Sequence, residues 1–261
     1  MKIHANGIAI NYRIDGQEGA PWLVFSNSLA TSIAMWDEQA AALKNSFRVL
    51  RYDQRGHGGT DAPPGRYLFD TLLADALGLL DALSIKKTHF AGLSMGGATA
   101  LGLAERHPDR FDRVIVCDSP CRSTPQSSQQ WEDRIAVASK DGIDALVEPT
   151  IARWFPTETV ANNPPHVDRV RAMIRATPVD GFIGCAAALA AHDYASAIAA
   201  VRRPVLFIVG EKDGATPAAM RKLDEQLSGS RFVELVGAGH ISNMDRPTEF
   251  THAVRDFLVV G

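Results

Sequence analysis

The chain has 261 residues, of which 46% are hydrophobic and 22% charged, and its formal net charge at pH 7 is −3. This length suffices for one large domain with a buried core, and the composition is that of an ordinary globular protein. The slightly negative charge and the even spread of basic residues argue against nucleic acid and an anionic membrane surface as partners.

The first 118 residues alternate apolar runs with helical patterns. Short continuous apolar runs predict strands buried on both faces, and apolar residues spaced three or four apart predict helices. In chain order we predict a strand of a hairpin at 8–12, a strand at 22–25, a helix at 32–43, a strand at 47–52, a loop at 56–65, a helix at 67–83, a strand at 87–93, a helix at 95–107 and a strand at 113–117. Such alternation is typical of a parallel sheet wrapped by helices.

The strand pattern lapses from about residue 119 to residue 200, where helical signals are broken by prolines. It returns with a strand at 204–209, a helix at about 217–227, a strand at 231–236 and a last helix at 248–259. We therefore predict an α/β fold with a mostly parallel sheet flanked by helices. Residues 1–118 and 201–261 would form this core, and residues 119–200 a helical cap inserted between two core strands.

One pentapeptide carries the strongest chemical signal. Gly92-Leu93-Ser94-Met95-Gly96 has the form G-x-S-x-G and lies between a predicted strand and a predicted helix. In that context the serine sits in a strained turn that projects its hydroxyl above the carboxyl edge of the sheet, and the glycines leave room for neighbouring chain. The helix that follows points its N-terminus at developing negative charge. Ser94 is therefore the predicted nucleophile.

A serine hydroxyl is a poor nucleophile unless a base takes its proton. His240 follows a predicted strand and lies beside Gly239, so we expect it on a loop that reaches across the sheet edge. His57 also lies in a glycine-rich loop after a strand and is the alternative base. The base in turn needs an acid that holds its tautomer and stabilises its cation.

Asp213 is the predicted acid because it comes directly after the strand at 204–209. It also completes the order serine, acid, histidine along the chain. Glu211, two residues earlier, and Asp118, after the preceding core strand, are the alternatives.

Acyl transfer also needs two N–H groups that bind the carbonyl oxygen as it gains charge. One is expected from Met95, the residue after the nucleophile. The other is expected from the loop after the strand at 22–25, where Leu29 is the predicted donor.

With these motifs in place, the chain resembles the α/β-hydrolase fold family over nearly its full length. Besides the serine pentapeptide, Tyr52-Asp53-Gln54-Arg55-Gly56-His57-Gly58 matches that family's D-x-R-G-x-G stretch. Gly210-Glu211-Lys212-Asp213 and Gly239-His240 resemble its acid and histidine blocks. The resemblance implies a serine hydrolase that needs neither a metal nor an organic cofactor.

A closer resemblance is to the 3-oxoadipate enol-lactonases of bacterial aromatic catabolism, in the β-ketoadipate pathway. Ala30 stands where that family is expected to have glycine. The resemblance implies that an anionic enol-lactone is opened to 3-oxoadipate through an acyl-enzyme. It rests on Phe25-Ser26-Asn27-Ser28-Leu29, Met35-Trp36-Asp37, the segment 91–97, and 131–135 with 153–155 in the cap.

The substrate of such an enzyme carries a free carboxylate. A pocket for it should contain a cation or converging N–H groups. Arg134 is the predicted cation, with Trp131 and Trp154 as the walls of the pocket.

Other interpretations of the same residues stay open. A general carboxylesterase or perhydrolase-like enzyme and a carbon–carbon bond hydrolase of the same fold share the serine, acid and histidine, because specificity lies in the cap and loops. A ligand receptor that retains the three residues is a further alternative. A dinucleotide-binding enzyme is disfavoured because no G-x-G-x-x-G follows the first core strand.

The cysteines and the N-terminal residues bear on location. Cys117, Cys121 and Cys185 form neither a disulfide framework nor a paired zinc pattern, so we expect free thiols in a reducing compartment. No apolar signal region follows Met1, and no apolar run approaches a membrane span. We therefore expect a cytoplasmic protein. The sequence leaves a homo-oligomer open.

Overall fold

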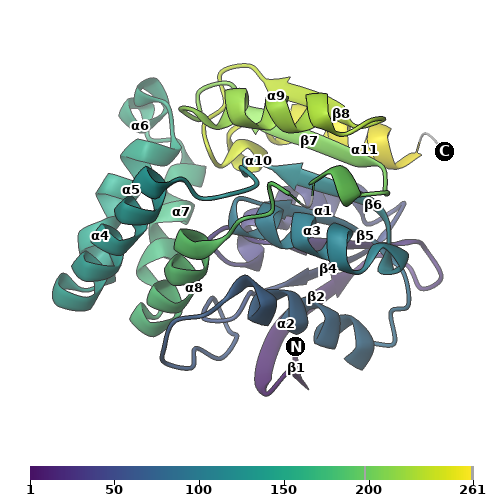
Figure 1. The fold of residues 1–261 in the computed structure, drawn as a ribbon, viewed down its shortest axis with the longest axis horizontal. Coiled ribbons are helices and arrows are strands. Elements are labelled where there is room, and N and C mark those ends of the chain that lie inside the picture. The colour runs from purple at the N-terminus through teal and green to yellow at the C-terminus, as the bar shows by residue number, and fades with distance from the viewer. Residues whose placement is uncertain (197, 260–261) are drawn as a thin grey trace.

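The computed structural model describes residues 1–196 and 198–259, and within them one eight-stranded sheet forms the centre (Figure 1). The strand order is β1-β2-β4-β3-β5-β6-β7-β8; β1 and β2 are antiparallel to their neighbours and all other neighbours are parallel. The strands are β1 (Lys2–Ala5), β2 (Ile8–Asp15), β3 (Trp22–Ser26), β4 (Arg48–Tyr52), β5 (Thr88–Leu93), β6 (Phe111–Cys117), β7 (Val205–Gly210) and β8 (Arg231–Leu235).

The central strands are buried almost throughout, as their continuous apolar sequences predict; β7 is buried at every residue. The predicted mostly parallel sheet flanked by helices is confirmed. The hairpin partner β1 was not predicted. It joins β2 through Asn6 and Gly7, which both have positive φ, as a tight two-residue hairpin requires.

Helices cover both faces of the sheet. In Figure 1, α2 and α3 lie in front of the sheet, while α1 and α11 pack against each other behind it. The helix predicted at 32–43 is split into a 3₁₀ turn and α1. The α-helices are α1 (Asp37–Leu43), α2 (Phe69–Ala82), α3 (Met95–Arg106), α4 (Pro125–Asp141), α5 (Val147–Trp154), α6 (Thr157–Asn162), α7 (Pro165–Arg175), α8 (Val179–Ala191), α9 (Thr216–Gln226), α10 (Ser242–Asp245) and α11 (Pro247–Val259). The 3₁₀ helices are η1 (Ile33–Trp36), η2 (Pro108–Arg110), η3 (Ile143–Leu146) and η4 (Ile198–Ala200).

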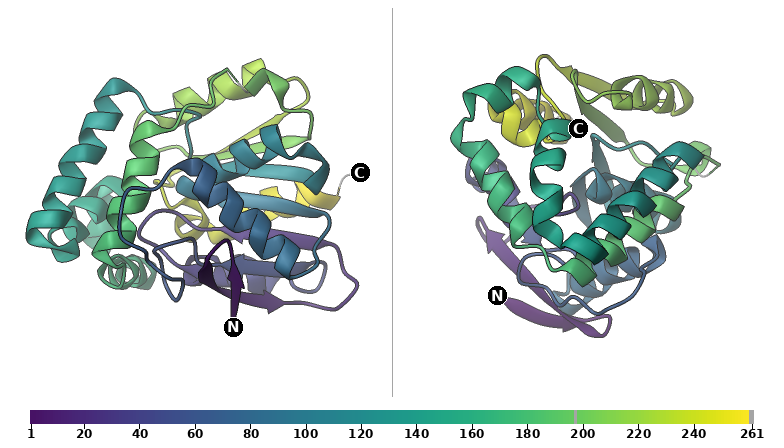
Figure 2. Two further views of the ribbon diagram at one scale, coloured as in Figure 1. Left: turned by 60° about the horizontal axis from the view of Figure 1, so that its bottom comes forward. Right: turned by 90° about the vertical axis from the view of Figure 1, so that its left-hand side faces the viewer.

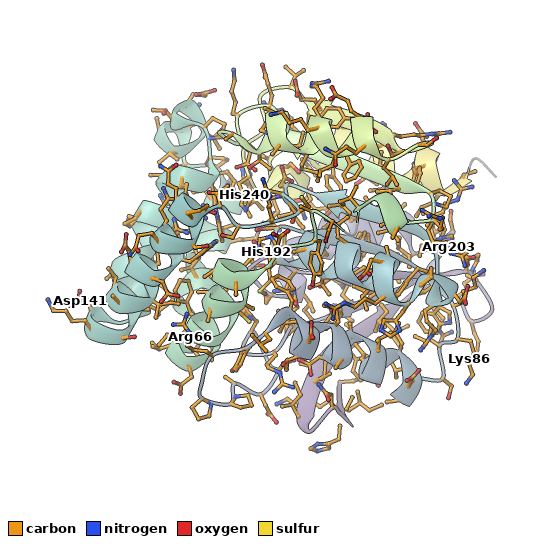
Figure 3. The ribbon with its side chains drawn as sticks, in the orientation of Figure 1. Arg66, Lys86, Asp141, His192, Arg203 and His240 are labelled. Carbon is orange, nitrogen blue, oxygen red and sulfur yellow. The ribbon has the colours of Figure 1, made fainter. Side chains whose placement is uncertain are left out.

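Helices α4 to α8, here called the cap helices, follow β6 and precede β7. They gather at one end of the sheet in Figure 1 and face the viewer in the right-hand view of Figure 2. Within them α4 packs along α8, and α5 packs on α7. Arg66, labelled in Figure 3, donates to Glu132 of α4 at 3.0 Å and so ties the loop before α2 to the cap helices. The boundaries 119–200 for a cap domain stay a prediction.

Two further features of the described residues bear on earlier expectations. No single helix among residues 1–196 and 198–259 has the length and hydropathy to cross a membrane; α7 and α8 would do so only together, and they are bent by 100°. Cys117, Cys121 and Cys185 are buried free thiols, as predicted.

Candidate active site

Ser94 lies in a tight turn between the end of β5 and the start of α3, and this turn depends on glycines beside it. Its φ of +57° is in the left-handed region, and its N–H donates to the carbonyl of Cys117 at 2.8 Å. A Cβ on Gly92 would lie 1.9 Å from the carbonyl oxygen of Gly96, and one on Gly96 would lie 2.2 Å from that of Ser26. Both positions therefore exclude side chains, and the tight turn follows.

The structure brings the three predicted residues into one hydrogen-bonded chain. His240 Nε2 is 3.0 Å from Ser94 Oγ, and His240 Nδ1 is 2.8 Å from Asp213 Oδ2. A carboxylate can only accept, so Nδ1 carries the proton and Nε2 is left to accept from the serine hydroxyl. This is the arrangement in which a histidine can serve as the base for a serine.

The acid and histidine loops meet because they lack side chains where they touch. A Cβ on Gly210, the last residue of β7, would lie 2.1 Å from the carbonyl oxygen of Gly239. The N–H of Lys212 donates to Ala238 at 2.8 Å and links the loop after β7 to the loop after β8. The absence of a side chain at Gly210 thus allows the loop of Asp213 to approach the loop of His240.

The alternative residues have other partners. His57 is buried, accepts the Ala30 N–H at Nε2 (2.8 Å) and donates from Nδ1 to the Arg55 carbonyl (3.0 Å). Burial lowers the pKa of His57, in keeping with this neutral form. The Glu211 carboxylate accepts the N–H of Gly237 at 2.8 Å. His57 and Glu211 are therefore placed as loop-binding groups rather than as base and acid.

Asp118, which directly follows β6, links that strand to β7 and α10 through hydrogen bonds. Its Oδ1 accepts the N–H of Gly210 at 2.8 Å, and its Oδ2 shares a short hydrogen bond with the hydroxyl of Ser242 on α10. Burial, and after it the negative charge of Asp213, raises the pKa of Asp118 well above its usual 3.8. Asp118 therefore lines the cavity beside the proposed acid, but its side-chain hydrogen bonds go to Gly210 and Ser242, whereas Asp213 bonds His240.

The raised pKa of Asp118 has a consequence for stability. The folded protein holds a proton that the unfolded chain releases above pH 3.8, so this contribution to stability is complete below pH 3.8 and is lost as the pH rises toward the folded pKa. The slope is at most about 1.4 kcal/mol per pH unit. Asp118→Asn keeps a donor and an acceptor but does not titrate. We expect wild type to lose melting temperature relative to this variant as the pH rises above about 4. Parallel thermal-unfolding curves at every pH would contradict it.

The two predicted oxyanion donors, Leu29 and Met95, lie in different local settings. Met95 is the first residue of α3, where helical N–H groups have no partner within the helix. In the loop after β3, the N–H groups of Ser28, Ala30 and Thr31 each donate to an acceptor. Leu29 N–H has no acceptor within the described chain, so it is free to bind a carbonyl oxygen of the substrate.

The loop that carries Leu29 is held from two sides. The side-chain amide of Asn27 donates to the carbonyls of Ser28 (2.9 Å) and Thr31 (3.0 Å), and its oxygen accepts the N–H of Gln54 (3.0 Å). Ala30 has a φ of +56°, which costs an L-residue about 1–2 kcal/mol and explains why glycine is the expected residue there. The bond from Ala30 to His57 stabilises this turn.

A cavity of about 330 Å³ lies above Ser94, between the sheet and the cap helices. In Figure 3, His240 and His192 lie between the cap helices and the sheet. Of the predicted binding residues, Trp131 lines the cavity, whereas Arg134 and Trp154 do not. Arg153, which was not predicted to bind substrate, does line it. Other lining residues include Ser94, Ser119, Arg122, His192 and His240.

Two guanidinium groups lie over the Trp131 ring, that of Arg134 at 5.0 Å from the ring centroid and that of Arg153 at 5.6 Å. Neither forms an ion pair with an acidic side chain among residues 1–196 and 198–259. Burial and the charge of Arg153 lower the pKa of Arg134 to about 9, and burial lowers that of Arg153. The negative charge of Asp213 opposes the shift of Arg153 but does not cancel it, so both guanidinium groups would be stabilised by a bound anion.

Comparisons with known proteins agree with this geometry. The family model described as alpha/beta hydrolase fold matches residues 21–159. The chain is 35% identical over 251 residues to 3-oxoadipate enol-lactonase 2 of Acinetobacter baylyi, covering 96% of this chain and 93% of that protein. It is 29% identical over 243 residues to "Putative carbamate hydrolase RutD" of Pseudomonas savastanoi pv. phaseolicola, covering 92% and 94%. The crystal structure of the enol-lactonase from Burkholderia xenovorans LB400 has a TM-score of 0.95 and 41% identity, with 99% of each chain covered.

Proposed function

The chain belongs to the α/β-hydrolase fold family and is a hydrolase, and from that premise we propose that it opens 3-oxoadipate enol-lactone to 3-oxoadipate. The reaction runs through an acyl-enzyme on Ser94 and belongs to bacterial aromatic catabolism. The observation that supports this substrate is a pair of guanidinium groups near the serine cavity, those of Arg134 and Arg153. Neither forms an ion pair with a carboxylate of the described residues. A cytoplasmic location stays a prediction from the sequence.

Ser94 Oγ attacks the lactone carbonyl carbon while its proton passes to Nε2 of His240. The carbonyl oxygen becomes an oxyanion between the N–H groups of Leu29 and Met95. Asp213 holds Nδ1 of the histidine and stabilises the imidazolium that forms. Each group thus acts on a charge that is larger in the transition state than in the bound substrate.

Collapse of the oxyanion breaks the ring carbon–oxygen bond. The departing enolate oxygen remains tethered to the acyl group and takes a proton from His240, and the resulting enol tautomerises to the ketone. Water then gives a proton to His240 and attacks the acyl carbon. The ester bond to Ser94 breaks, the serine recovers its proton, and 3-oxoadipate leaves with two carboxylates.

The substrate carboxylate pairs with Arg153, whose side chain lines the cavity, and Trp131 supports that guanidinium from one face. Arg134 lies over the same ring and adds positive charge from outside the cavity lining. A charge-assisted pair of this kind positions the lactone carbonyl over Ser94.

The proposal is tested by the ratio of kcat/KM values on three substrates: 3-oxoadipate enol-lactone, a neutral aryl ester and a carbamate. We expect the lactone to be preferred by about 10- to 150-fold, because a charge-assisted bond adds about 1.5–3 kcal/mol to its binding. A preferred carbamate would favour the second candidate, a carbamate hydrolase, which the RutD relative supports. Faster turnover of the aryl ester would replace the lactonase proposal by a general esterase.

Arg153→Ala is expected to lower kcat/KM for the anionic lactone by about 10- to 100-fold. The value for a neutral ester such as p-nitrophenyl acetate should change by less than about threefold, because that substrate has no carboxylate for the guanidinium. Arg134→Ala should have a smaller effect because Arg134 does not line the cavity.

The matched control is Arg175→Ala, which removes an exposed cap arginine on α7 that pairs with Asp144. It should leave kcat/KM unchanged for both substrates. If Arg153→Ala lowers kcat/KM equally for the lactone and the ester, Arg153 acts through the nearby Asp213 instead of binding the substrate.

A further inference from the structure

The last residue of α5 contacts the loop of the predicted base directly. The carbonyl of Trp154 accepts the N–H of His240 at 2.7 Å. Because Trp154 ends its helix, this carbonyl has no helical partner and is free to accept. A Cβ on Gly239 would lie 2.2 Å from the same oxygen, so the close approach requires glycine. The cap helices are therefore docked on the histidine loop through backbone.

The side chain of Trp154 makes a second, separate contact. Its indole stacks on the His240 imidazole, with ring centroids 5.7 Å apart and an interplanar angle of 29°. The indole is only 2% exposed, so solvent does not screen the contact. The sequence predicts Trp154 as a wall of the substrate pocket, but the structure places it against the base and outside the cavity lining.

We propose that Trp154 is a positioning residue that orients His240 and stabilises its imidazolium. The negative face of an indole attracts a cation, and the strength of that attraction rises when water is excluded. The imidazole is neutral before Ser94 gives up its proton and cationic in the transition state, so the indole favours the transition state over the ground state. This inference rests on the proposed role of His240 as the base.

The two contacts of Trp154 can be separated experimentally. The hydrogen bond to His240 comes from the backbone carbonyl and persists in any side-chain variant, whereas the stacking is lost in Trp154→Leu. Trp154→Phe keeps a smaller aromatic face. We expect the charged and titratable groups around the histidine loop to keep their places in both variants. They are Asp213, Asp118, Asp245, Arg153, His166, Glu211 and Arg246.

The test is the pH–rate profile of kcat/KM for p-nitrophenyl acetate, a substrate that does not titrate. In Trp154→Leu we expect kcat/KM to fall by about 2- to 30-fold and the acidic limb of the profile to move to lower pH by about 0.4–1.5 units. Trp154→Phe should show a smaller shift of the same sign. A merely structural role would lower activity in proportion to the folded fraction without moving the limb.

The matched control is Phe155→Leu, which removes the neighbouring buried ring; that ring contacts His166 and not His240. Its acidic limb should coincide with that of wild type. The inference would be overturned if Trp154→Leu and Trp154→Phe are folded, their acidic limbs coincide with that of wild type, and Ser94→Ala is inactive. An active Ser94→Ala would instead show that the proposed function itself has failed.

Discussion

Ser94→Ala is expected to lower kcat on the enol-lactone by about 10⁴- to 10⁶-fold, because no covalent intermediate can form without the hydroxyl. The remaining rate would come from the oxyanion donors and from binding of the substrate. KM should stay within about threefold, since the cavity and Arg153 are untouched. The measurement is the loss of lactone absorbance under steady-state conditions.

Stability serves as the internal control for this variant. Ser94 donates its backbone N–H to Cys117, and alanine keeps that bond, so the melting temperature should barely change. Ser139→Ala removes a hydroxyl that donates to Ile135 within α4, and it should be as active as wild type. Ser94→Ala with more than about a tenth of wild-type kcat would rule out the serine as nucleophile.

Asp213→Asn is expected to lower kcat by about 10⁴-fold with little change in KM. An amide at this position can donate to Nδ1 of His240, which would place the ring proton on Nε2 and turn the nitrogen facing Ser94 from acceptor to donor. The serine proton would then have no base to receive it. The measurement is kcat on the lactone across the pH range of the wild-type enzyme.

Asp118→Asn is the matched comparison, since the sequence leaves Asp118 open as the alternative acid. Its carboxyl bonds Gly210 and Ser242, and an asparagine can keep both bonds, so kcat should fall by less than about tenfold. The reverse order, with Asp118→Asn the more damaging change, would move the acid from the end of β7 to the end of β6.

The sequence predicts the central part of the fold because its signals are local. Buried parallel strands are short apolar runs, and each observed strand end lies within two residues of its prediction except that β2 extends to Asp15 and β1 was missed. β1 is only four residues long and half exposed, so its apolar pattern is weak. The helix α10 was missed because it is only four residues long, although all four are buried.

The three reacting side chains are also predictable from sequence, because each occupies a loop after a strand of a parallel sheet. Such loops meet at one edge, so Ser94, Asp213 and His240 converge whatever lies between them. Leu29 is favoured by its loop, but only the structure shows that the neighbouring N–H groups are already donated. His57 and Asp118 also lie in loops after strands, but their side chains form hydrogen bonds with other parts of the fold.

The placement of the cap side chains is set by the tertiary structure alone. Trp154 and Arg153 are adjacent on α5, yet one packs on His240 and the other lines the cavity. Which way each points depends on the angle at which α5 docks on a loop more than eighty residues later, and no local pattern encodes that angle. The sequence therefore determined the sheet and the reacting groups, because these follow from short-range patterns and from the geometry of parallel strands. The proposed substrate cation and the proposed support of the histidine depend on long-range packing, which only the folded chain contains.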